Sequence, residues 1–221
     1  MYSRNAKIYF NKGATKLFFF RFLYRFLQNK ITCKMKKIVV FASGSGTNAE
    51  NIIKYFLNTS KAKVVSVLTN NPSAKVIERA SKYTIPTQIF SKQELNEGFL
   101  LQKINLLQPD LIVLAGFLLK VPQNLIDAYP NKIINIHPAL LPKFGGKGMY
   151  GMHIHEAVVA NKEKETGITI HYVNENYDEG AIIFQKSVAL LEEDTPEIVA
   201  EKIHKLEQDH FPQVIDKLLN D

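Results

Sequence analysis

Short apolar runs alternate with amphipathic segments along the first part of the chain. Apolar or β-prone runs that predict strands lie at 38–42, 64–68, 87–90, 111–115 and 132–134. Segments whose apolar side chains recur at helical spacing lie at 49–56, 74–83, 91–107 and 122–129. Strands that alternate with helices in this way imply a parallel sheet with helices on both faces. We therefore predict a doubly wound, mostly parallel α/β fold, similar to a Rossmann fold.

One helix in this region carries a clear start signal. Ser91 and Glu94 have the spacing of a capping box, in which each side chain bonds to the other residue's backbone. The apolar positions continue to Leu107, and Pro109 follows. We expect a single helix between Ser91 and Leu107.

The pattern changes after Pro142. A glycine-rich loop precedes an expected helix at 153–160, and residues 166–173 alternate with period two, as in a strand. A second strand is expected at 181–185, and the two strands should form an antiparallel extension of the sheet. Thr195 and Pro196 then open a long helix that reaches about Leu219. Pro212 lies inside this helix and should kink or break it near His210.

The basic charge of the chain is concentrated in its first 34 residues. The formal net charge is +7, and residues 1–34 hold eight of the 28 basic residues but no acidic residue. The remaining 20 basic residues face 21 acidic ones, so residues 35–221 are nearly neutral. Residues 35–221 thus lack the excess of basic residues that is typical of a nucleic-acid-binding domain, and we expect no nucleic acid partner. The only cysteine, Cys33, fits a reducing, cytoplasmic compartment.

Residues 1–34 have the character of a basic, aromatic leader. Its apolar stretch is interrupted by Arg21 and Arg25, so it is too short for a membrane span and does not fit a signal peptide. A helix lying on a membrane surface is one alternative. The other is that translation begins at Met35, directly before the first strand. We expect residues 35–221 to form one domain without the leader, and no membrane association of that domain.

The segment Asn135-Ile136-His137-Pro138 follows a buried strand and precedes an irregular loop. Ligands of open α/β sheets bind beyond the carboxyl ends of the strands. Residues two apart on an extended segment point to the same side, so Asn135 and His137 should face one site. An amide donor beside an imidazole suits acyl transfer, which needs an oxyanion donor and a proton shuttle. The alternative is that Asn135 caps a turn and His137 packs in the core.

A carboxylate beside His137 would raise its pKa and fix its tautomer. Asp178, in the acidic loop at 174–180, is the best candidate, because Gly180 would let the backbone turn close to a ligand. The alternative for Asp178 is a solvated turn residue.

A second candidate site lies in the glycine loop after the first strand. Residues 44–48, Gly-Ser-Gly-Thr-Asn, join a strand to a helix, which is the arrangement that binds anions through backbone N–H groups. The dinucleotide fingerprint fits only formally, because the next strand ends in Thr69-Asn70-Asn71 without an acidic residue for a ribose. We therefore expect a single phosphate here. The alternative is a tight turn that merely requires glycine.

The other histidines give weaker signals. On a helix, His153 and His155 would point to different sides, so a metal site is not expected. His171, His204 and His210 have no evident partners in the sequence, and packed or exposed side chains are the default interpretation.

Five segments together resemble the phosphoribosylglycinamide formyltransferases, a family within the folate-dependent formyltransferase superfamily. They are Ser43–Asn48, Leu114–Phe117, Asn135–Pro142 and Gly167–Val173 with Asp178–Gly180. The resemblance runs from Met35 to about Leu219. It implies transfer of the formyl group of 10-formyltetrahydrofolate, a co-substrate, to the amine of glycinamide ribonucleotide in the biosynthesis of purines, without a tightly bound cofactor or metal.

The resemblance also implies roles for individual residues. Asn135 would bond the formyl oxygen, His137 would act as general acid, and Asp178 would raise the pKa of His137 and help to remove the amine proton. Contacts to the phosphate and ribose would come from Gly44, Ser45, Gly46, Thr47, Asn48 and Glu207. Contacts to the folate would come from Leu118, Leu119, Lys120 and Val121, with Asn135.

Some features depart from this family pattern. Leu119 stands where many relatives carry an arginine, Lys92 or Gln93 would replace another, and the loop at 143–152 is unusually rich in glycine. Another formyltransferase or formyl hydrolase of the superfamily and a phosphate-binding module without catalysis are the alternatives. The oligomeric state, monomer or homodimer, stays open.

Overall fold

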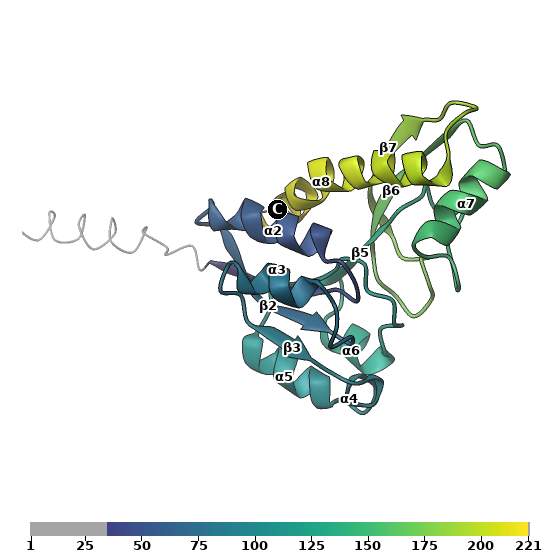
Figure 1. Cartoon of the computed structure of the whole chain (residues 1–221). Coiled ribbons are helices and arrows are strands. Elements are labelled where there is room, and N and C mark those ends of the chain that lie inside the picture. Colours follow the sequence, from purple (N-terminus) through teal and green to yellow (C-terminus); the bar gives the residue numbers. More distant parts are fainter. Residues whose placement is uncertain (1–34, 221) are drawn as a thin grey trace, which may run out of the picture. The chain divides into compact units, whose positions relative to one another are not determined.

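The chain forms a seven-stranded sheet flanked by helices (Figure 1). The computed structural model describes residues 35–220, so the expectation for residues 1–34 lies outside the described residues. The strands are β1 (Lys36–Phe41), β2 (Ala62–Thr69), β3 (Thr87–Ile89), β4 (Leu111–Leu114), β5 (Ile133–His137), β6 (Glu165–Tyr172) and β7 (Ile182–Ala189). Their order in the sheet is β3-β2-β1-β4-β5-β6-β7. β1 to β5 pair in parallel, and β6 and β7 extend the sheet antiparallel, as predicted.

Seven helices cover the sheet in the described part of the chain. They are α2 (Thr47–Leu57), α3 (Val76–Ser81), α4 (Lys92–Asn96), α5 (Phe99–Leu107), α6 (Gln123–Ala128), α7 (Met152–Ala160) and α8 (Pro196–Asn220). α8 runs beside α2 and α7 and also contacts β6 and β7 (Figure 1). The doubly wound class predicted from the sequence is therefore confirmed.

The alternation of side chains along the strands divides the core in two. On β1, Ile38 and Val40 belong to the core that includes residues of α2, α3, α7 and α8, whereas Val39 and Phe41 belong to the core that includes residues of α4 to α6. These four side chains are completely buried. Burial on both faces is why the strands are continuous apolar runs.

The helix expected between Ser91 and Leu107 is two helices. The capping box is present, with Ser91 Oγ accepting from the N–H of Glu94 at 3.1 Å and the Glu94 carboxylate accepting from the N–H of Ser91 at 2.9 Å. α4 nevertheless ends after Asn96, because Gly98 adopts φ 85°, in the left-handed region. The change in direction leaves Phe99 52% exposed, although its spacing suggested a core position.

The expected break at Pro212 does not occur, and α8 continues unbroken through it. Proline lacks the N–H that would bond to the carbonyl four residues earlier, which is that of Gln208. This carbonyl instead accepts a hydrogen bond from Nδ2 of Asn51 on α2, at 2.8 Å. A side chain from another helix thus replaces the missing partner, and the bond also ties α8 to α2.

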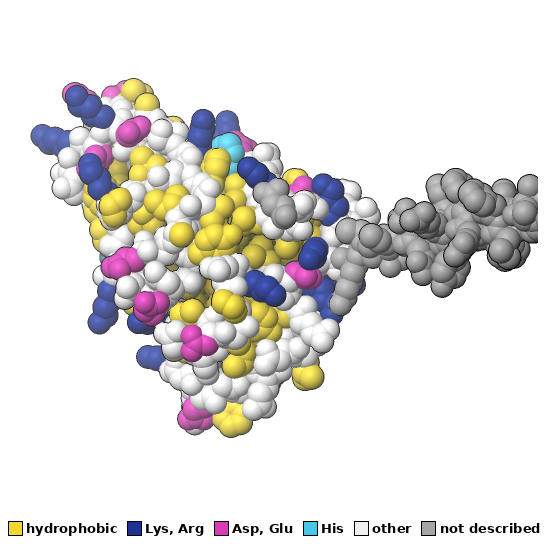
Figure 2. Space-filling view, turned by 180° about the vertical axis from the view of Figure 1, so that it is seen from behind, with side chains coloured by type: hydrophobic (Ala, Val, Ile, Leu, Met, Phe, Trp, Pro, Cys, Tyr) yellow, Lys and Arg dark blue, Asp and Glu magenta, His cyan; other side chains and the backbone are white. Residues whose placement is uncertain are grey.

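The face seen from behind combines apolar and charged surface. Hydrophobic side chains gather across its middle, while basic and acidic side chains are interspersed mainly around its edge (Figure 2). Among the described residues, no helix is both long and apolar enough to cross a membrane.

Candidate active site

A cavity of about 650 Å³ opens beyond the carboxyl ends of β1, β4 and β5. This is the position at which open α/β sheets bind ligands. Lys92 and Gln93, named as replacements for a family arginine, do not line the cavity, but its wall includes all the residues expected to act in catalysis or in binding the substrates. They are Gly44, Ser45, Gly46, Thr47, Asn48, Leu118, Leu119, Lys120, Val121, Asn135, His137, Asp178 and Glu207. The candidate phosphate, acyl-transfer and folate positions therefore share one space.

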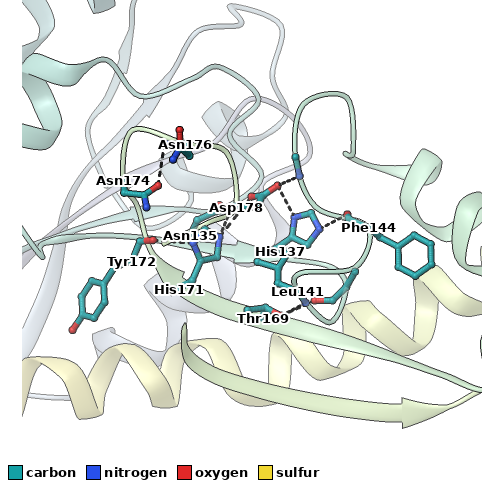
Figure 3. A network of polar contacts seen from close by, with 12 residues as sticks. Asn135, His137, Leu141, Phe144, Thr169, His171, Tyr172, Asn174, Asn176 and Asp178 are labelled. Carbon is teal, nitrogen blue, oxygen red and sulfur yellow. Dashed lines mark hydrogen bonds and ion pairs between the residues drawn. The ribbon is translucent and has the colours of Figure 1, made fainter. Parts of the chain in front are cut away.

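Asn135 and His137 lie on β5 itself and project from the same face of the sheet. The antiparallel register places Asn135 opposite His171 and His137 opposite Thr169 on β6. All four side chains occupy positions of the same parity, so they share one face (Figure 3). The alternative that Asn135 caps a turn does not hold, because Asn135 is inside a strand.

The turn after His137 is held by Thr169. Oγ1 of Thr169 donates to the carbonyl of Ala139 at 2.7 Å and accepts from the N–H of Leu141 at 3.0 Å. Nε2 of Gln185 on β7 also donates to this hydroxyl, at 2.9 Å. These bonds satisfy buried polar groups and fix the course of the chain directly after the imidazole.

His137 is 3% exposed, and both of its ring nitrogens face acceptors. Nε2 donates to the carbonyl oxygen of Phe144 at 2.8 Å, so this nitrogen carries a hydrogen. Nδ1 lies 3.5 Å from Oδ2 of Asp178 (Figure 3). A proton on Nδ1 would therefore be stabilised by the carboxylate, and the pair can take up or release one proton at this nitrogen.

Burial determines the direction in which the pKa of His137 shifts. Removal from water lowers this pKa, and the Asp178 charge and the Phe144 carbonyl only partly oppose that effect. The sequence-based expectation that Asp178 raises the pKa gives the right sign for that interaction, but the net shift is downward. For Asp178, burial raises the pKa, yet the neighbouring imidazoles of His171 and His137 and the hydrogen bond from the Gly146 N–H outweigh it, so the pKa lies below the usual value.

Asp178 is presented by a strained turn. Its backbone has φ 58°, and its Oδ2 accepts from the N–H of Gly146 at 2.9 Å. Gly180 has a different role from the one expected, because its backbone packs against protein rather than ligand. A Cβ at Gly180 would lie 1.7 Å from the carbonyl oxygen of Tyr172. The glycine therefore allows the loop to close against β6, which brings Asp178 to the imidazole.

The glycine loop presents a run of backbone donors. Its carbonyls are used inside the protein, since Val76 N–H donates to Gly44, Arg79 Nε donates to Ser45 at 2.9 Å, and Glu50 N–H donates to Gly46. The N–H groups from Gly44 to Ala49 have no acceptor within the described part of the chain. Unpaired N–H groups at the start of a helix can bind an anion such as phosphate.

Gly46 is required at this position for two reasons. Its φ of 73° favours glycine, and a Cβ would lie 2.4 Å from Cγ2 of Val76. The tight-turn and anion-site interpretations thus describe the same loop. The close contact with α3 is what directs the N–H groups towards the cavity.

Glu207 reaches the cavity from α8. Its Oε2 accepts from Nδ2 of Asn48 at 2.8 Å and lies 3.6 Å from Nδ1 of His204. Hydrogen bonding to Glu207 raises the pKa of His204. The predicted phosphate residue Asn48 and the predicted ribose residue Glu207 are therefore in direct contact.

The residues expected to bind folate follow β4, the strand next to β1 in the sheet, and also line the cavity. The N–H of Leu118 donates to Oγ of Ser43 at 3.0 Å, and that hydroxyl donates to Oδ1 of Asn70 at 2.7 Å. Lys120 Nζ lies 5.7 Å from the centre of the Tyr177 ring, within the range of a cation–π contact. These contacts join the loop to the glycine loop and to the acidic loop.

Three histidines of the cavity, His155, His171 and His204, were given no role in the sequence analysis. His171 is 2% exposed and bonds to Asn135, and His155 is 6% exposed on α7. Only the register of β5 against β6 reveals the position of His171, because a shift of one residue would turn the side chain to the other face. His155 has no comparable signal beyond its place on the buried side of a helix.

His153 and His155 diverge, as expected for neighbours on a helix. His153 is exposed and lies 3.3 Å from Glu156, whereas His155 is buried. Among residues 35–220, no group of histidine, cysteine and acidic side chains has the arrangement of a metal site.

Comparison with known proteins agrees with this geometry. Residues 36–215 match the family model described as formyl transferase. The phosphoribosylglycinamide formyltransferase of Bacillus subtilis (strain 168) is 40% identical over 191 residues, covering 84% of this chain and 95% of that protein.

Solved structures give the same result. Phosphoribosylglycinamide formyltransferase from Bacillus halodurans superposes with a TM-score of 0.75 at 39% identity, covering 83% of this chain and 95% of that one. Glycinamide ribonucleotide transformylase 1 from Geobacillus kaustophilus gives 0.77 at 37% identity, covering 84% and 99%. The sequence, the fold and the cavity thus agree, and the chain belongs to the formyl transferase family, among the phosphoribosylglycinamide formyltransferases.

Proposed function

We propose that this chain transfers the formyl group of 10-formyltetrahydrofolate to the amine of N1-(5-phospho-D-ribosyl)glycinamide, a step of purine (IMP) biosynthesis. The observation that carries the proposal is the single cavity that joins the N–H groups of the glycine loop to Asn135, His137 and Asp178. One end suits a phosphate and the other suits acyl transfer, as a phosphorylated amine acceptor requires.

Asn135, His137 and Asp178 divide the chemistry. The amine nitrogen attacks the formyl carbon, and the carbonyl oxygen becomes an oxyanion that accepts a hydrogen bond from Asn135. The new C–N bond remains, the bond from the carbon to N10 of the folate breaks, and N10 takes a proton. The amine loses a proton to the pair formed by His137 and Asp178, which lie 3.5 Å apart.

The proton donated to the leaving nitrogen comes from His137. In the present arrangement its Nε2–H is bonded to the Phe144 carbonyl, so delivery of this proton requires that contact to open. The amine proton taken up at Nδ1 keeps the ring neutral, and proton exchange with water then restores the Nε2–H form. Phe144 belongs to the glycine-rich stretch whose Gly146 N–H also bonds Asp178. We infer that entry of the folate into the cavity displaces this loop.

The two ligands bind different parts of the cavity wall. The phosphate binds the N–H groups of residues 44–49, and the ribose hydroxyls donate to Glu207, which is already fixed by Asn48. The folate lies along residues 118–121, mainly against backbone. A cytoplasmic location suits these small-molecule substrates, and residues 35–221 are the unit that binds them.

The test is a formyl-transfer assay with the full chain, 10-formyltetrahydrofolate and glycinamide ribonucleotide. The expected result is release of tetrahydrofolate with formation of the N-formyl product, and a fall in turnover of at least about 100-fold in His137→Ala. If the chain binds folate but does not transfer the formyl group to this amine, a different amine must be the acceptor. Absence of folate binding, or full activity in His137→Ala, would overturn it.

A further inference from the structure

His171 is buried directly beside the proposed oxyanion donor. Its Nε2 lies 3.2 Å from Nδ2 of Asn135, and its Nδ1 lies 2.9 Å from the carbonyl oxygen of its neighbour Tyr172 (Figure 3). The two facing residues, Asn135 and His171, are register partners on β5 and β6. The mechanism proposed above assigns no role to this imidazole.

The Tyr172 carbonyl fixes the tautomer of His171. A carbonyl oxygen can only accept, so Nδ1 must carry a hydrogen. In the neutral ring Nε2 then has a lone pair and no hydrogen, and it accepts from the nearest donor, Nδ2 of Asn135. Both hydrogen bonds are therefore donated in the same direction: the Asn135 amide donates to His171, and His171 donates to the Tyr172 carbonyl.

The backbone of Tyr172 is held in place on both sides. Its N–H donates to the carbonyl of Ala181 at 2.9 Å, and its carbonyl packs so closely against Gly180 that a Cβ there would lie 1.7 Å away. The acceptor for His171 is therefore held by the antiparallel extension of the sheet. Fixed acceptors of this kind orient imidazoles in many sites.

We propose that His171, as its Nδ1–H tautomer, is a positioning residue that orients the carboxamide of Asn135. An asparagine amide can otherwise rotate by half a turn and exchange its donor and acceptor. Acceptance of one Nδ2 hydrogen by His171 leaves the second hydrogen of Nδ2 for the cavity, where the formyl oxygen develops charge. This inference rests on the proposed function, because it assigns that oxygen to Asn135.

The competing arrangement is a cationic His171 paired with Asp178. Nε2 would then carry a hydrogen and face the Nδ2 donor of Asn135 at 3.2 Å, whereas Oδ1 of Asp178 is farther away, at 3.6 Å. Asp178 also has other partners, since its Oδ2 accepts from Gly146 and lies 3.5 Å from His137. The shorter contact of Nε2 is therefore the one to Asn135.

The experiment is a double-mutant cycle between residues 171 and 135, read by kcat and by KM for both substrates. Leucine at 171 removes the acceptor, whereas glutamine retains an acceptor near the position of Nε2. We expect His171→Leu to lower kcat by about 10- to 100-fold with both KM values nearly unchanged, since one preorganised donor is lost. His171→Gln should retain kcat within about three-fold.

The cycle separates positioning from structural support. If His171 acts through Asn135, His171→Leu should change kcat by less than about two-fold in an Asn135→Ala background. An equal loss in both backgrounds, or a loss in His171→Gln as large as in His171→Leu, would overturn the proposal. Failure of the wild-type chain to use glycinamide ribonucleotide would instead count against the proposed function.

The tautomer can be measured without any substitution. ¹⁵N NMR of the labelled wild-type chain distinguishes a nitrogen that carries a hydrogen from one that does not. We expect His171 to show a protonated Nδ1 and an unprotonated Nε2 under assay conditions. A protonated Nε2 would overturn the proposal, even if a variant at 171 fails to fold.

Discussion

Nδ1 of His137 lies 3.5 Å from Oδ2 of Asp178, while Nε2 of the same ring donates to a backbone carbonyl. The carboxylate therefore acts on one defined nitrogen.

Asp178→Asn should lower kcat by about 100-fold or more, because an amide cannot stabilise a proton on Nδ1 of His137 as a carboxylate can. KM for either substrate should change little, and the amide oxygen can still accept from the Gly146 N–H. Steady-state kinetics measure the effect. Glu179→Gln, an exposed neighbour, is the matched control, and an equal loss there would contradict the assignment.

Glu207→Gln should raise KM for glycinamide ribonucleotide by about 10-fold and leave KM for the folate unchanged. A neutral amide accepts weaker hydrogen bonds than a carboxylate, by about 1 kcal/mol or more. Glu201→Gln, on the exposed side of the same helix, controls for loss of charge. An equal rise in the KM values for both substrates would show that Glu207 does not specifically bind the ribose.

Gly46→Ala should destabilise the protein by about 1 to 3 kcal/mol, because the residue has φ 73° and the added Cβ meets Val76. Gly44→Ala is the comparison, since nothing lies within 4 Å of its Cβ position. The free energy of unfolding, measured in denaturant, should fall clearly more for Gly46→Ala. Equal losses would show that the approach of α3 does not require this glycine.

Stability should depend on pH through His155. Burial lowers its pKa, so between its folded and unfolded pKa values the unfolded chain binds a proton that the folded chain does not. The stabilisation is therefore present at high pH and is lost as pH falls through the ordinary histidine range. His155→Leu should lose less unfolding free energy than wild type between about pH 7.5 and about pH 5.5.

The matched control for this measurement is His153→Leu. This exposed histidine lies on the same helix, so its replacement should leave the dependence of stability on pH near that of wild type. If both variants gave the wild-type dependence, another group would be responsible.

Removal of residues 1–34 should leave turnover unchanged. Every residue that we assign to catalysis or binding lies between Gly44 and Glu207. A chain that begins at Met35 can be compared with the full chain in the same assay. A large loss of turnover would assign the leader a role in folding or activity.

Local pattern was sufficient for the sheet but not for every helix. Apolar runs and alternating patterns predicted β1 to β7, because the burial of each strand face directly determines whether its residues are apolar or polar. The division between α4 and α5 depends on the left-handed conformation of one residue, Gly98. The continuity of α8 depends on Asn51, a residue far away in the sequence, which bonds the carbonyl that Pro212 leaves free.

The same distinction applies to the site. Asn135, His137 and Asp178 were predicted because a motif and an acidic loop can each be recognised locally, and the structure brings His137 and Asp178 together. His171 was not predicted, because its position follows from the register of two strands. The net fall in the pKa of His137 was also missed, since burial cannot be judged from a list of neighbours.

The contact between Asn48 and Glu207 joins residues 159 positions apart. During synthesis, the glycine loop and β5 leave the ribosome well before α8, the last described helix. A nascent chain can thus form the catalytic pair while it still lacks the wall that holds the ribose. Until α8 docks, Asn48 lacks the carboxylate that fixes its side chain, so incomplete chains on ribosomes should bind the substrate more weakly.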